Sequence, residues 1–505
     1  MNSALLLEHY ARIADAPDAI VRLRALVVAL ATLGRITGYE GPWLHATLGD
    51  LGRWGSGGTP SKSHPEYYGG EIPWVVIGDL NDGIVNTSQS TISHIGLENS
   101  AAKIIEPGAV LIAMYGSIGK LGINAMPCAT NQAIAYCHTF ERLVSRDFFF
   151  WLLRSLRGKL LDRGQGVAQQ NISQKILKAW PVELPELAEQ QRIVAKVEEL
   201  MELCDQLEAA RAEREAGRDR LTAATLASLN APEPETFPAD ARFALDSLTP
   251  LTTRPDQIKH LRQTILNLAV RGKLVTQDAR GEPASEFLKQ IAVDKSARAV
   301  SARDRRASTI QPLTDADVGS TLPATWLWVR FGDIIISRDG ERIPVSRDER
   351  SRREKFYDYY GASGVIDKID GFLFDKPLLL IGEDGANLIN RSTPIAFVAR
   401  GKYWVNNHAH VLDGLSETFL RYLELFINAI DLKPYVTGTA QPKMNQAKMN
   451  SIPVALPPAS EQHRIVARVD ELMALCDQLE ASLTEGEQTR SRLLESVLRN
   501  ALEPA

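Results

Sequence analysis

The feature that most constrains this chain is a helical segment that is written twice. Residues 189–209 read EQQRIVAKVEELMELCDQLEA, and residues 461–481 read EQHRIVARVDELMALCDQLEA. Only four positions differ, although the second copy starts 272 residues after the first. An internal repeat decides the architecture of a chain, because each copy is expected to occupy an equivalent place in the fold.

The repeat extends beyond this segment. At the same offset, PVELP at 181–185 matches PVALP at 453–457, which predicts an extended stretch before each helix. A second pair of helices, DAIVRLRALVVALATLGRI at 18–36 and DQIKHLRQTILNLAVRGKL at 256–274, also recurs. The blocks between these helices match only thinly, as in TNQA at 130–133 against NNHA at 406–409. The sequence therefore predicts a duplicated unit of helix, variable domain and helix.

The repeated helices carry apolar residues at alternating spacings of four and three, which is the seam of a coiled coil. The seam residues are Ile193, Val197, Leu200, Cys204 and Leu207 in the first copy, and Ile465, Val469, Leu472, Cys476 and Leu479 in the second. Helix-favouring residues continue to about 230 and 501, and 40 residues of helix span roughly 60 Å. We therefore predict long antiparallel coiled-coil spacers, with a helix lying on its own domain as the alternative.

These patterns predict an α+β protein: an internal duplication of two globular α/β domains separated by long antiparallel coiled-coil helices. The expected boundaries are an N-terminal helical segment at 1–40, a first variable domain at 41–187, a central helical region at 188–320, a second variable domain at 321–458 and a C-terminal helix at 459–505. The proline-rich stretch 231–255 is expected to be a non-helical connection that turns the chain back.

Composition narrows the class of protein. The chain has 505 residues and a net charge of −5, and it contains no apolar run long enough to cross a membrane. Its start lacks the basic region of a signal peptide and carries acids early, so we do not expect a signal peptide. The four cysteines form no C-x2-C pair, which favours free thiols over a metal site or disulfides. We expect a cytoplasmic protein with no metal of its own.

Signatures of catalysis are missing from the sequence. MYGSIGKLG at 114–122 departs from a phosphate-binding loop, because Met114 and Leu121 stand where that loop requires glycine and a hydroxyl. The motifs of dinucleotide binding, amino-methyl transfer, zinc proteolysis, serine hydrolysis and helicases are also absent. We interpret the chain as one that positions something and leaves chemistry to its partners.

The first variable domain contains two candidate nucleic-acid loops. A glycine-rich loop at 55–62 combines backbone amides, hydroxyls and a lysine, which suit phosphate contacts. The segment GQGVAQQNISQK at 164–175 concentrates amides that can grip adenine in a major groove. A flexible loop and a merely hydrated loop are the respective alternatives. The candidate residues are Ser56, Gly57, Gly58, Thr59, Ser61, Lys62, Lys120, Gln165, Gln169, Gln170, Asn171 and Lys175.

The second variable domain has a comparable amide loop, TGTAQPKMNQAK at 437–448, a cationic run at 338–355 and the cluster NNH at 406–408. A lone histidine is more often structural than functional. The candidates are Arg342, Arg347, Arg350, Asn406, Asn407, His408, Gln441, Lys443 and Asn445. Because neither domain is strongly basic, specific affinity would need a basic partner protein to share the phosphate contacts.

Taken together, these motifs resemble the specificity subunits of type I restriction–modification enzymes. LRQTILNLAVRGKLVTQDARGEPASEFLKQI at 261–291 is similar to the central conserved region of that family, and the EQ-x-RIV helices are similar to its repeats. GGTPSKSHPEYYGGEIPWVVIGDLN at 57–81 resembles the opening of its target-recognition domains, and YYGASGVID, LLIGEDGANL and WVNNHAHVL resemble later blocks. The resemblance covers nearly the whole chain, in the expected order.

The resemblance implies a non-catalytic subunit whose two domains each read one half of a bipartite DNA target. Two modification subunits would dock on the conserved helices, where Ile193, Val197, Leu200, Leu207, Ile465, Val469, Leu472 and Leu479 are the candidate contacts, and methylate adenine with S-adenosylmethionine. Restriction subunits would add ATP- and Mg-dependent translocation and cleavage. Readers on a pseudo-two-fold axis would contact half-sites about one DNA turn, ~34 Å, apart. The alternative is a structural or anti-restriction scaffold that binds the modification subunit without reading DNA.

Overall fold

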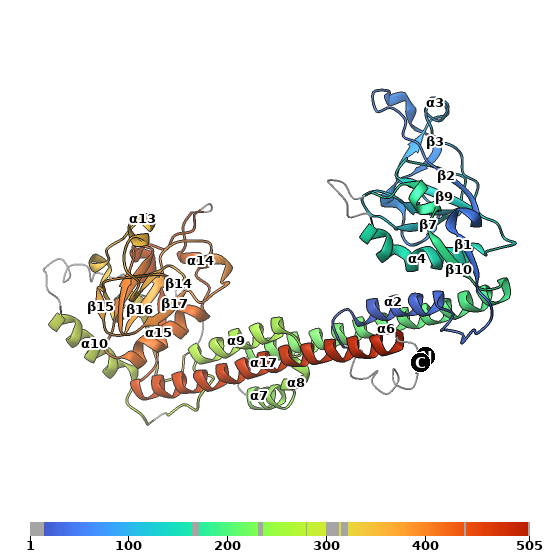
Figure 1. Ribbon diagram of the computed structural model, residues 1–505. Helices are drawn as coiled ribbons and strands as arrows, with labels where there is room; N and C mark the ends of the chain where they lie inside the picture. The colour runs from blue at the N-terminus through green and yellow to red at the C-terminus, as the bar shows by residue number, and fades with distance from the viewer. Residues whose placement is uncertain are drawn as a thin grey trace. The chain divides into compact units, whose positions relative to one another are not determined.

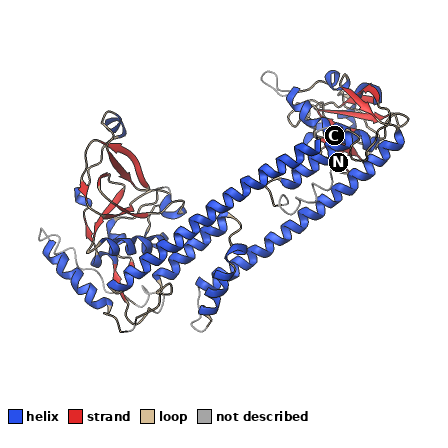
Figure 2. Cartoon of the chain, turned by 60° about the horizontal axis from the view of Figure 1, so that its bottom comes forward, coloured by secondary structure: helices blue, strands red, loops and turns tan. Residues whose placement is uncertain are grey.

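The computed structural model describes residues 15–163, 171–230, 236–278, 280–298, 313–314, 322–438 and 441–502. The chain divides into two compact units, one formed by residues 1–215 and 485–505 and the other by residues 216–484. In each unit the strands gather in one globular domain, and long helices lie beside it (Figures 1 and 2). The chain leaves the first unit within α6 (Leu187–Asn230) and returns to it within α17 (Ala459–Leu502).

The domain of the first unit contains a five-stranded sheet in the order β2-β9-β6-β7-β4, a three-stranded sheet in the order β5-β3-β8 and the pair β1-β10. The strands are β1 (Leu44–Thr47), β2 (Gly52–Ser56), β3 (Tyr68–Val75), β4 (Gly83–Val85), β5 (Thr91–Ile92), β6 (Val110–Ala113), β7 (Leu121–Asn124), β8 (Ala129–Thr130), β9 (Ile134–Thr139) and β10 (Pro181–Leu184). The helices are η1 (Leu48–Leu51), η2 (Pro65–Tyr67), η3 (Ile77–Asp79), α3 (His94–Glu98), α4 (Arg146–Arg163) and α5 (Gln174–Lys178).

The domain of the second unit contains four-stranded sheets in the orders β12-β19-β16-β17 and β14-β13-β18-β15, and the pair β11-β20. The strands are β11 (Leu327–Arg330), β12 (Ile336–Ser337), β13 (Tyr357–Gly361), β14 (Gly364–Ile369), β15 (Phe374–Asp375), β16 (Leu378–Gly382), β17 (Ala396–Ala399), β18 (Lys402–Val405), β19 (Ala409–Asp413) and β20 (Pro453–Leu456). The helices are α10 (Ala284–Arg298), α12 (Phe331–Ile334), η5 (Asp339–Glu341), α13 (Arg347–Ser351), α14 (Asn387–Asn390), α15 (Glu417–Ala429), η6 (Lys433–Tyr435) and α16 (Gln446–Asn450).

The two domains share a four-strand core, β2-β9-β6-β7 in the first and β12-β19-β16-β17 in the second, which confirms the predicted duplication. In both cores, a fully buried apolar strand, β6 or β16, lies between two neighbours, as its continuous apolar run favours. Ala113 pairs with Ile134 in the first domain and Gly382 with Ala409 in the second. This register makes Asn131 the counterpart of Asn406 and corrects the sequence alignment by one residue. In the other sheet of each domain, the pairs β3 with β8 and β13 with β18 are both parallel.

Antiparallel helix pairs support each domain, as the sequence predicts. In the first unit, Arg24 of α2 (Ala19–Thr32) donates to Asp205 at 2.6 Å and to Glu208 at 2.7 Å on α6. In the second, Arg262 of α9 (Pro255–Val270) donates to Asp477 at 2.6 Å and to Glu480 at 3.1 Å on α17. The two acidic pairs are 272 residues apart, so the duplication preserves the contact as well as the helices.

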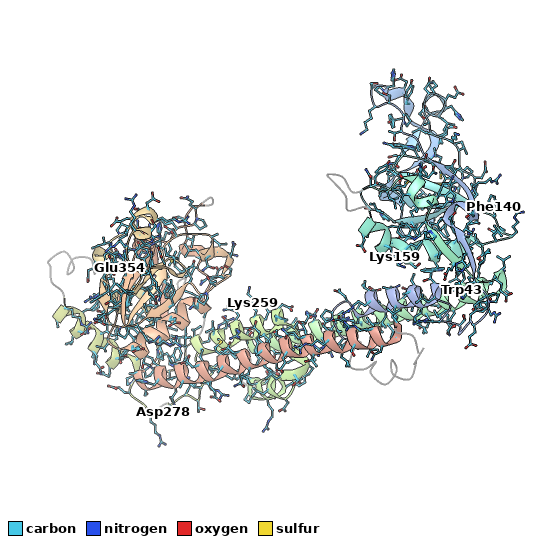
Figure 3. The ribbon with its side chains drawn as sticks, viewed as in Figure 1. Trp43, Phe140, Lys159, Lys259, Asp278 and Glu354 are labelled. Carbon is cyan, nitrogen blue, oxygen red and sulfur yellow. The ribbon has the colours of Figure 1, made fainter. Side chains whose placement is uncertain are left out.

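Both helices of the α2 type end in the same way. Gly34 and Gly272 follow their helices with φ angles of +67°, and the next residue donates its amide back to Leu30 or Leu268 at 3.0 Å. This pattern is the Schellman motif, in which glycine relieves the steric cost of a left-handed backbone. From this turn the chain enters the first domain past Trp43 (Figure 3), whose ring would lie 2.6 Å from a Cβ on Gly34.

The seam residues are used within the chain itself. Ile193, Val197, Ile465 and Val469 are at most 1% exposed and belong to the cores of their own domains. Leu200, Leu207, Leu472 and Leu479 are half-buried. The alternative of a helix lying on its own domain is therefore correct for the first half of each copy. The prediction that the four buried residues contact a partner subunit is wrong, because no surface of theirs remains.

The stretch 231–255 is not the non-helical connection expected from its prolines. It contains α7 (Phe237–Asp246) and α8 (Leu248–Leu251). The proline of α7 lies in its first turn, where a missing amide hydrogen costs nothing. The chain then turns as predicted, and α9 returns along the end of α6, where Asn230 donates to Thr264 at 3.0 Å and accepts from Asn267 at 2.9 Å.

Candidate nucleic-acid interface

Three loops meet at one end of the sheet that contains β6 in the first domain and β16 in the second, and we call each set a rim. The first rim consists of residues 114–115, 131–133 and 171–173, and the second of residues 383–384, 406–408 and 443–445. Met114 donates its amide to Ala133 at 2.7 Å and accepts from Ile172 at 2.9 Å. Glu383 makes the same two backbone bonds, to His408 and from Met444, both at 2.8 Å. The rims therefore share one backbone frame.

The side chains on this frame differ. An isolated antiparallel bridge joins Tyr115 to Asn171 in the first rim, and an equivalent bridge joins Asp384 to Lys443 in the second. A neutral aromatic and an amide thus occupy the positions that an acid and a base occupy in the other domain. Variable side chains on a constant frame are the arrangement expected of two recognition surfaces with unlike targets.

The glycine-rich loop of the first domain lies beside its rim, but two of its residues do not serve as predicted. The amides of Gly57 and Gly58 donate to Ile134 at 3.1 Å and Thr130 at 2.9 Å, so neither has a hydrogen left for phosphate. A Cβ on either glycine would lie within 2.3 Å of neighbouring backbone. Close packing explains both glycines, and the prediction of phosphate contacts through their amides is wrong.

Some of the other candidate side chains of the first domain have hydrogen-bond partners within the domain, and the rest are exposed. Thr59 is hydrogen-bonded to Gln132 of the rim, and Lys120 is half-buried with its ammonium 3.2 Å from the Ile77 carbonyl. Exposed positions are occupied by Ser56, Ser61, Lys62, Asn171 and Lys175. Gln165, Gln169 and Gln170 lie outside the described residues. The structure thus brings the glycine-rich loop, Gln132 and Asn171 to one end of the domain.

Two arginines of the second domain that were predicted as DNA contacts have partners within the domain. Arg342 is 13% exposed and donates to Glu383 at 2.8 Å and to the Ala409 carbonyl at 2.7 Å. Arg350 is also 13% exposed, and it pairs with Asp367 at 3.0 Å and lies 4.5 Å above the ring of Tyr359. Both guanidinium groups are thus anchored within the domain. Arg347 is exposed on α13.

The NNH cluster forms the middle loop of the second rim. Asn406 is 5% exposed and accepts the amide of His408 at 2.8 Å, just as Asn131 accepts that of Ala133 at 3.2 Å. Asn406 therefore builds a turn, and its prediction as a DNA contact is wrong. Asn407 and His408 are exposed, and His408 Nδ1 lies 2.8 Å from Asp384.

The amide loop of the second domain forms the third segment of its rim. Gln441 and Lys443 are exposed, and the Lys443 ammonium lies 3.2 Å from Glu383. Asn445 caps α16 by accepting the amide of Lys448 at 2.9 Å, as Ser173 caps α5 by accepting that of Ile176 at 3.3 Å. The capping oxygen of Asn445 is thus occupied, although the residue is exposed.

Comparison with known families agrees with this geometry. A family model described as the type I restriction modification DNA specificity domain matches residues 40–214 and again residues 323–486, together more than half of the chain. Each match covers one domain and the start of the repeated helix after it.

The chain belongs to the family of type I restriction–modification specificity subunits.

Curated members of this family from Escherichia coli are similar over long stretches. The type I restriction enzyme EcoEI specificity subunit is 28% identical over 66% of this chain, and the EcoAI specificity subunit is 27% identical over 72%. The chain spans 60% and 65% of the lengths of these two relatives. One similar solved structure has a TM-score of 0.50 at 17% identity. Its description concerns the structural basis underlying complex assembly and conformational transition of the type I R-M system. That match covers 92% of this chain and 99% of the other, and it supports the shared fold.

A buried charged cluster under the second rim of this specificity subunit was missed by the sequence analysis. His410 is 1% exposed, with Nδ1 2.6 Å from Asp339 and Nε2 2.9 Å from the Met444 carbonyl. Burial opposes a charge on His410, but Asp339, Met444 and Glu383 together raise its pKa. The signal in the sequence was a histidine at a core position of the strand AHVLD, which requires a partner when buried.

The described residues of this specificity subunit contain neither a candidate metal cluster nor a candidate membrane-spanning helix. Among them, no group of three or more histidine, cysteine and acidic side chains is arranged to hold a metal ion. None of their helices combines the length and apolar character needed to cross a membrane.

Proposed function

We propose that this chain selects the DNA target of a type I restriction–modification enzyme, with each domain reading one half of an asymmetric bipartite sequence. The observation that carries the proposal is the pair of rims, which repeat one backbone frame and differ in the side chains upon it. Readers of unlike half-sites need this combination, because sequence is discriminated by side chains at base edges, which must differ between the domains, while the docking of each domain on the duplex can stay the same.

The exposed rim residues have suitable chemistry for reading DNA. In the first domain, Gln132 and Asn171 offer amides, which pair with adenine, while Lys62 lies in the loop after β2 and Lys175 in the first turn of α5. In the second, Asn407, His408 and Lys443 offer an amide and two nitrogen donors. The few exposed cations on each domain support a shared phosphate contact with a partner subunit.

Docking of two modification subunits belongs to the same proposal, on a face of the repeated helices other than the buried seam. Leu203 is 46% exposed on α6, and its counterpart Leu475 is 37% exposed on α17. Each follows an ion pair on the same helix, Lys196–Glu199 at 2.8 Å and Arg468–Glu471 at 2.6 Å. Equivalent apolar positions with equivalent charged neighbours suit two copies of one partner. These partners would hold S-adenosylmethionine, and ATP and Mg would belong to the restriction subunits.

The test of target selection is a map of N6-methyladenine across a plasmid library, made with this chain and its modification subunits. We expect two unequal half-sites of ~3–5 base pairs around an unread spacer of roughly 5–8. Replacing residues 41–187 with the first domain of another specificity subunit should alter one half-site only. Methylation at sites with no bipartite motif, or a stable complex that methylates nothing, would favour the scaffold that does not read DNA.

The test of docking uses charge substitutions on the exposed leucines. Leu203→Asp and Leu475→Asp should each reduce the stoichiometry from two modification subunits to one, and the double variant should bind neither. Leu221, 40% exposed on the same α6 but outside the repeated segment, provides the matched control. Mass measurement of the complexes decides the matter, and retention of both subunits by the double variant would refute this docking face.

A further inference from the structure

The bridge that closes each rim offers a way to assign base preference to particular residues. Tyr115 and Asn171 face each other across one bridge, and Asp384 and Lys443 across the other. Tyr115 is 39% exposed, and the side chains of Asp384 and Lys443 are 32% and 53% exposed. All four lie at the surface in at least part of their side chain.

The backbone around these positions is the same in both domains. The residue before Tyr115 and the residue before Asp384 each donate to the middle loop of the rim and accept from the residue after the bridge partner. The following helix, α5 or α16, starts three residues after the bridge partner, and its first turn is capped. Because the backbone around the bridge is the same in both domains, the bridge positions differ between the domains in their side chains and not in their backbone contacts.

In the second domain, the bridge presents an acceptor and a donor together. Asp384 has one oxygen 2.8 Å from His408, and Lys443 has its ammonium 3.2 Å from Glu383. A carboxylate has capacity for several hydrogen bonds and an ammonium has three hydrogens, so both retain capacity for a ligand. In the major groove, guanine offers two acceptors and its paired cytosine offers an amino donor. A lysine and an aspartate side by side complement the two bases of one G·C pair.

In the first domain, the same positions carry no charge. The amide of Asn171 has a donor and an acceptor on one planar group, which matches N7 and the amino group of adenine. Tyr115 adds an aromatic face with a hydroxyl, which suits the methyl edge of thymine. The first bridge therefore complements an A·T pair.

We infer that the rim bridge is a specificity-determining position in each domain, with Asp384–Lys443 selecting a G·C pair and Tyr115–Asn171 selecting an A·T pair. This inference rests on the proposed function, since it assigns base preference to domains that read DNA. If the inference holds, the two bridge residues of one domain can be replaced by those of the other domain while the surrounding backbone contacts stay the same.

The experiment exchanges the bridges in the complex of this chain with its modification subunits. The double variant Asp384→Tyr, Lys443→Asn should lose preference for a G·C pair at one position of the second half-site, by about 5- to 150-fold, which is the range of one good base contact. The reciprocal Tyr115→Asp, Asn171→Lys should do the same to an A·T pair in the first half-site. The readout is the methylation map, scored position by position.

A matched control separates base reading from general charge. Lys368 is 55% exposed in the same second domain and has a carboxylate partner, Asp358, at 3.5 Å, but it lies on β14 and not on the rim. Lys368→Asn should leave every position of the motif unchanged. Circular dichroism and subunit stoichiometry identify any variant that fails to fold. In that case the single Lys443→Gln, which keeps a side chain of similar length, replaces the double variant.

The outcomes distinguish the inference from the function beneath it. A wild-type map without a bipartite motif would reject the proposed function itself. A bipartite wild-type motif that survives both bridge exchanges in folded complexes would reject the bridge as a specificity position and leave the function standing. A change in the half-site of the other domain would reject the assignment of bridge to half-site.

Discussion

At the scale of single residues, the buried pair His410–Asp339 under the second rim is expected to contribute to the stability of the second unit. His410→Gln should lower the free energy of unfolding of the second unit by about 3 kcal/mol, because the substitution removes the nearest cationic partner of the buried Asp339 carboxylate and leaves only Arg342 at 3.6 Å. Chemical denaturation followed by circular dichroism measures this loss. The exposed His408, whose side chain is 52% exposed in its pair with Asp384, is the control, and His408→Gln should cost under about 1 kcal/mol.

The same pair sets a pH dependence with a definite sign. The folded protein raises the pKa of His410 above its ordinary 6.5, so the stability it contributes is complete below that value and is lost as pH rises through the folded-state pKa. Burial raises the pKa of Asp339, but His410, the Val411 amide and Arg342 outweigh it and lower that pKa below 3.8, so its contribution is lost as pH falls. The difference between wild type and His410→Gln should therefore be largest between 3.8 and 6.5. A difference that grows at alkaline pH would contradict this account.

Residue type alone predicted the location of the candidate site better than the role of each residue in it. Asn406, Arg342 and Gly57 were chosen because their groups can contact DNA, and all three lie at or beside a rim. Each of them uses its polar groups in hydrogen bonds within the domain instead. Whether an amide or guanidinium is free depends on which other loops arrive beside it, and that follows from tertiary packing, which no local pattern contains.

At the scale of elements, the helix ends are where the sequence and the fold agree most closely. Gly34 and Gly38 both have φ angles near +70°, but a Cβ would meet Trp43 at 2.6 Å on Gly34 and nothing within 4 Å on Gly38. Gly38→Ala should cost about 1–2 kcal/mol from the left-handed backbone alone. Gly34→Ala should cost about 1–3 kcal/mol more, because it also overpacks the Trp43 contact. The measurement is the unfolding of the first unit, and equal costs would show that the Trp43 ring moves aside.

The helices were predictable because duplication supplied a second copy of each pattern, including the Schellman turn after α2 and α9. The partner of the seam was less predictable. A spacing of four and three indicates an apolar stripe, but it does not say whether another helix or the chain's own domain covers it. Ile193 and Ile465 are covered by both, together with α2 or α9 and a domain core. α7 was missed because proline counts as a breaker in composition yet is tolerated in a first helical turn.

At the scale of the whole molecule, each unit is completed by the far end of the other repeated helix. The end of α6 belongs to the second unit, where Asn230 bonds to Thr264 and Asn267 of α9. The end of α17 belongs to the first unit, where Leu494 is fully buried with Ala16 and Ala19. The first unit thus combines two separate segments, 1–215 and 485–505, whereas the second is the continuous stretch 216–484 that contains the end of α6 and most of α17. Each repeated helix is therefore longer than one domain requires, because it contributes to both units.

This arrangement predicts that a substitution near the C-terminus destabilises the first unit. Leu494→Ala should lower the free energy of unfolding by about 2–5 kcal/mol, as is usual when truncation of a fully buried leucine leaves a cavity. Hydrogen exchange should then accelerate in α2 and leave α9 unchanged, because α9 packs on the other half of the molecule. Leu502→Ala, at a side chain 40% exposed on the same helix, should alter neither. Faster exchange in α9, or unchanged exchange in α2, would mean that the end of α17 does not complete the first unit.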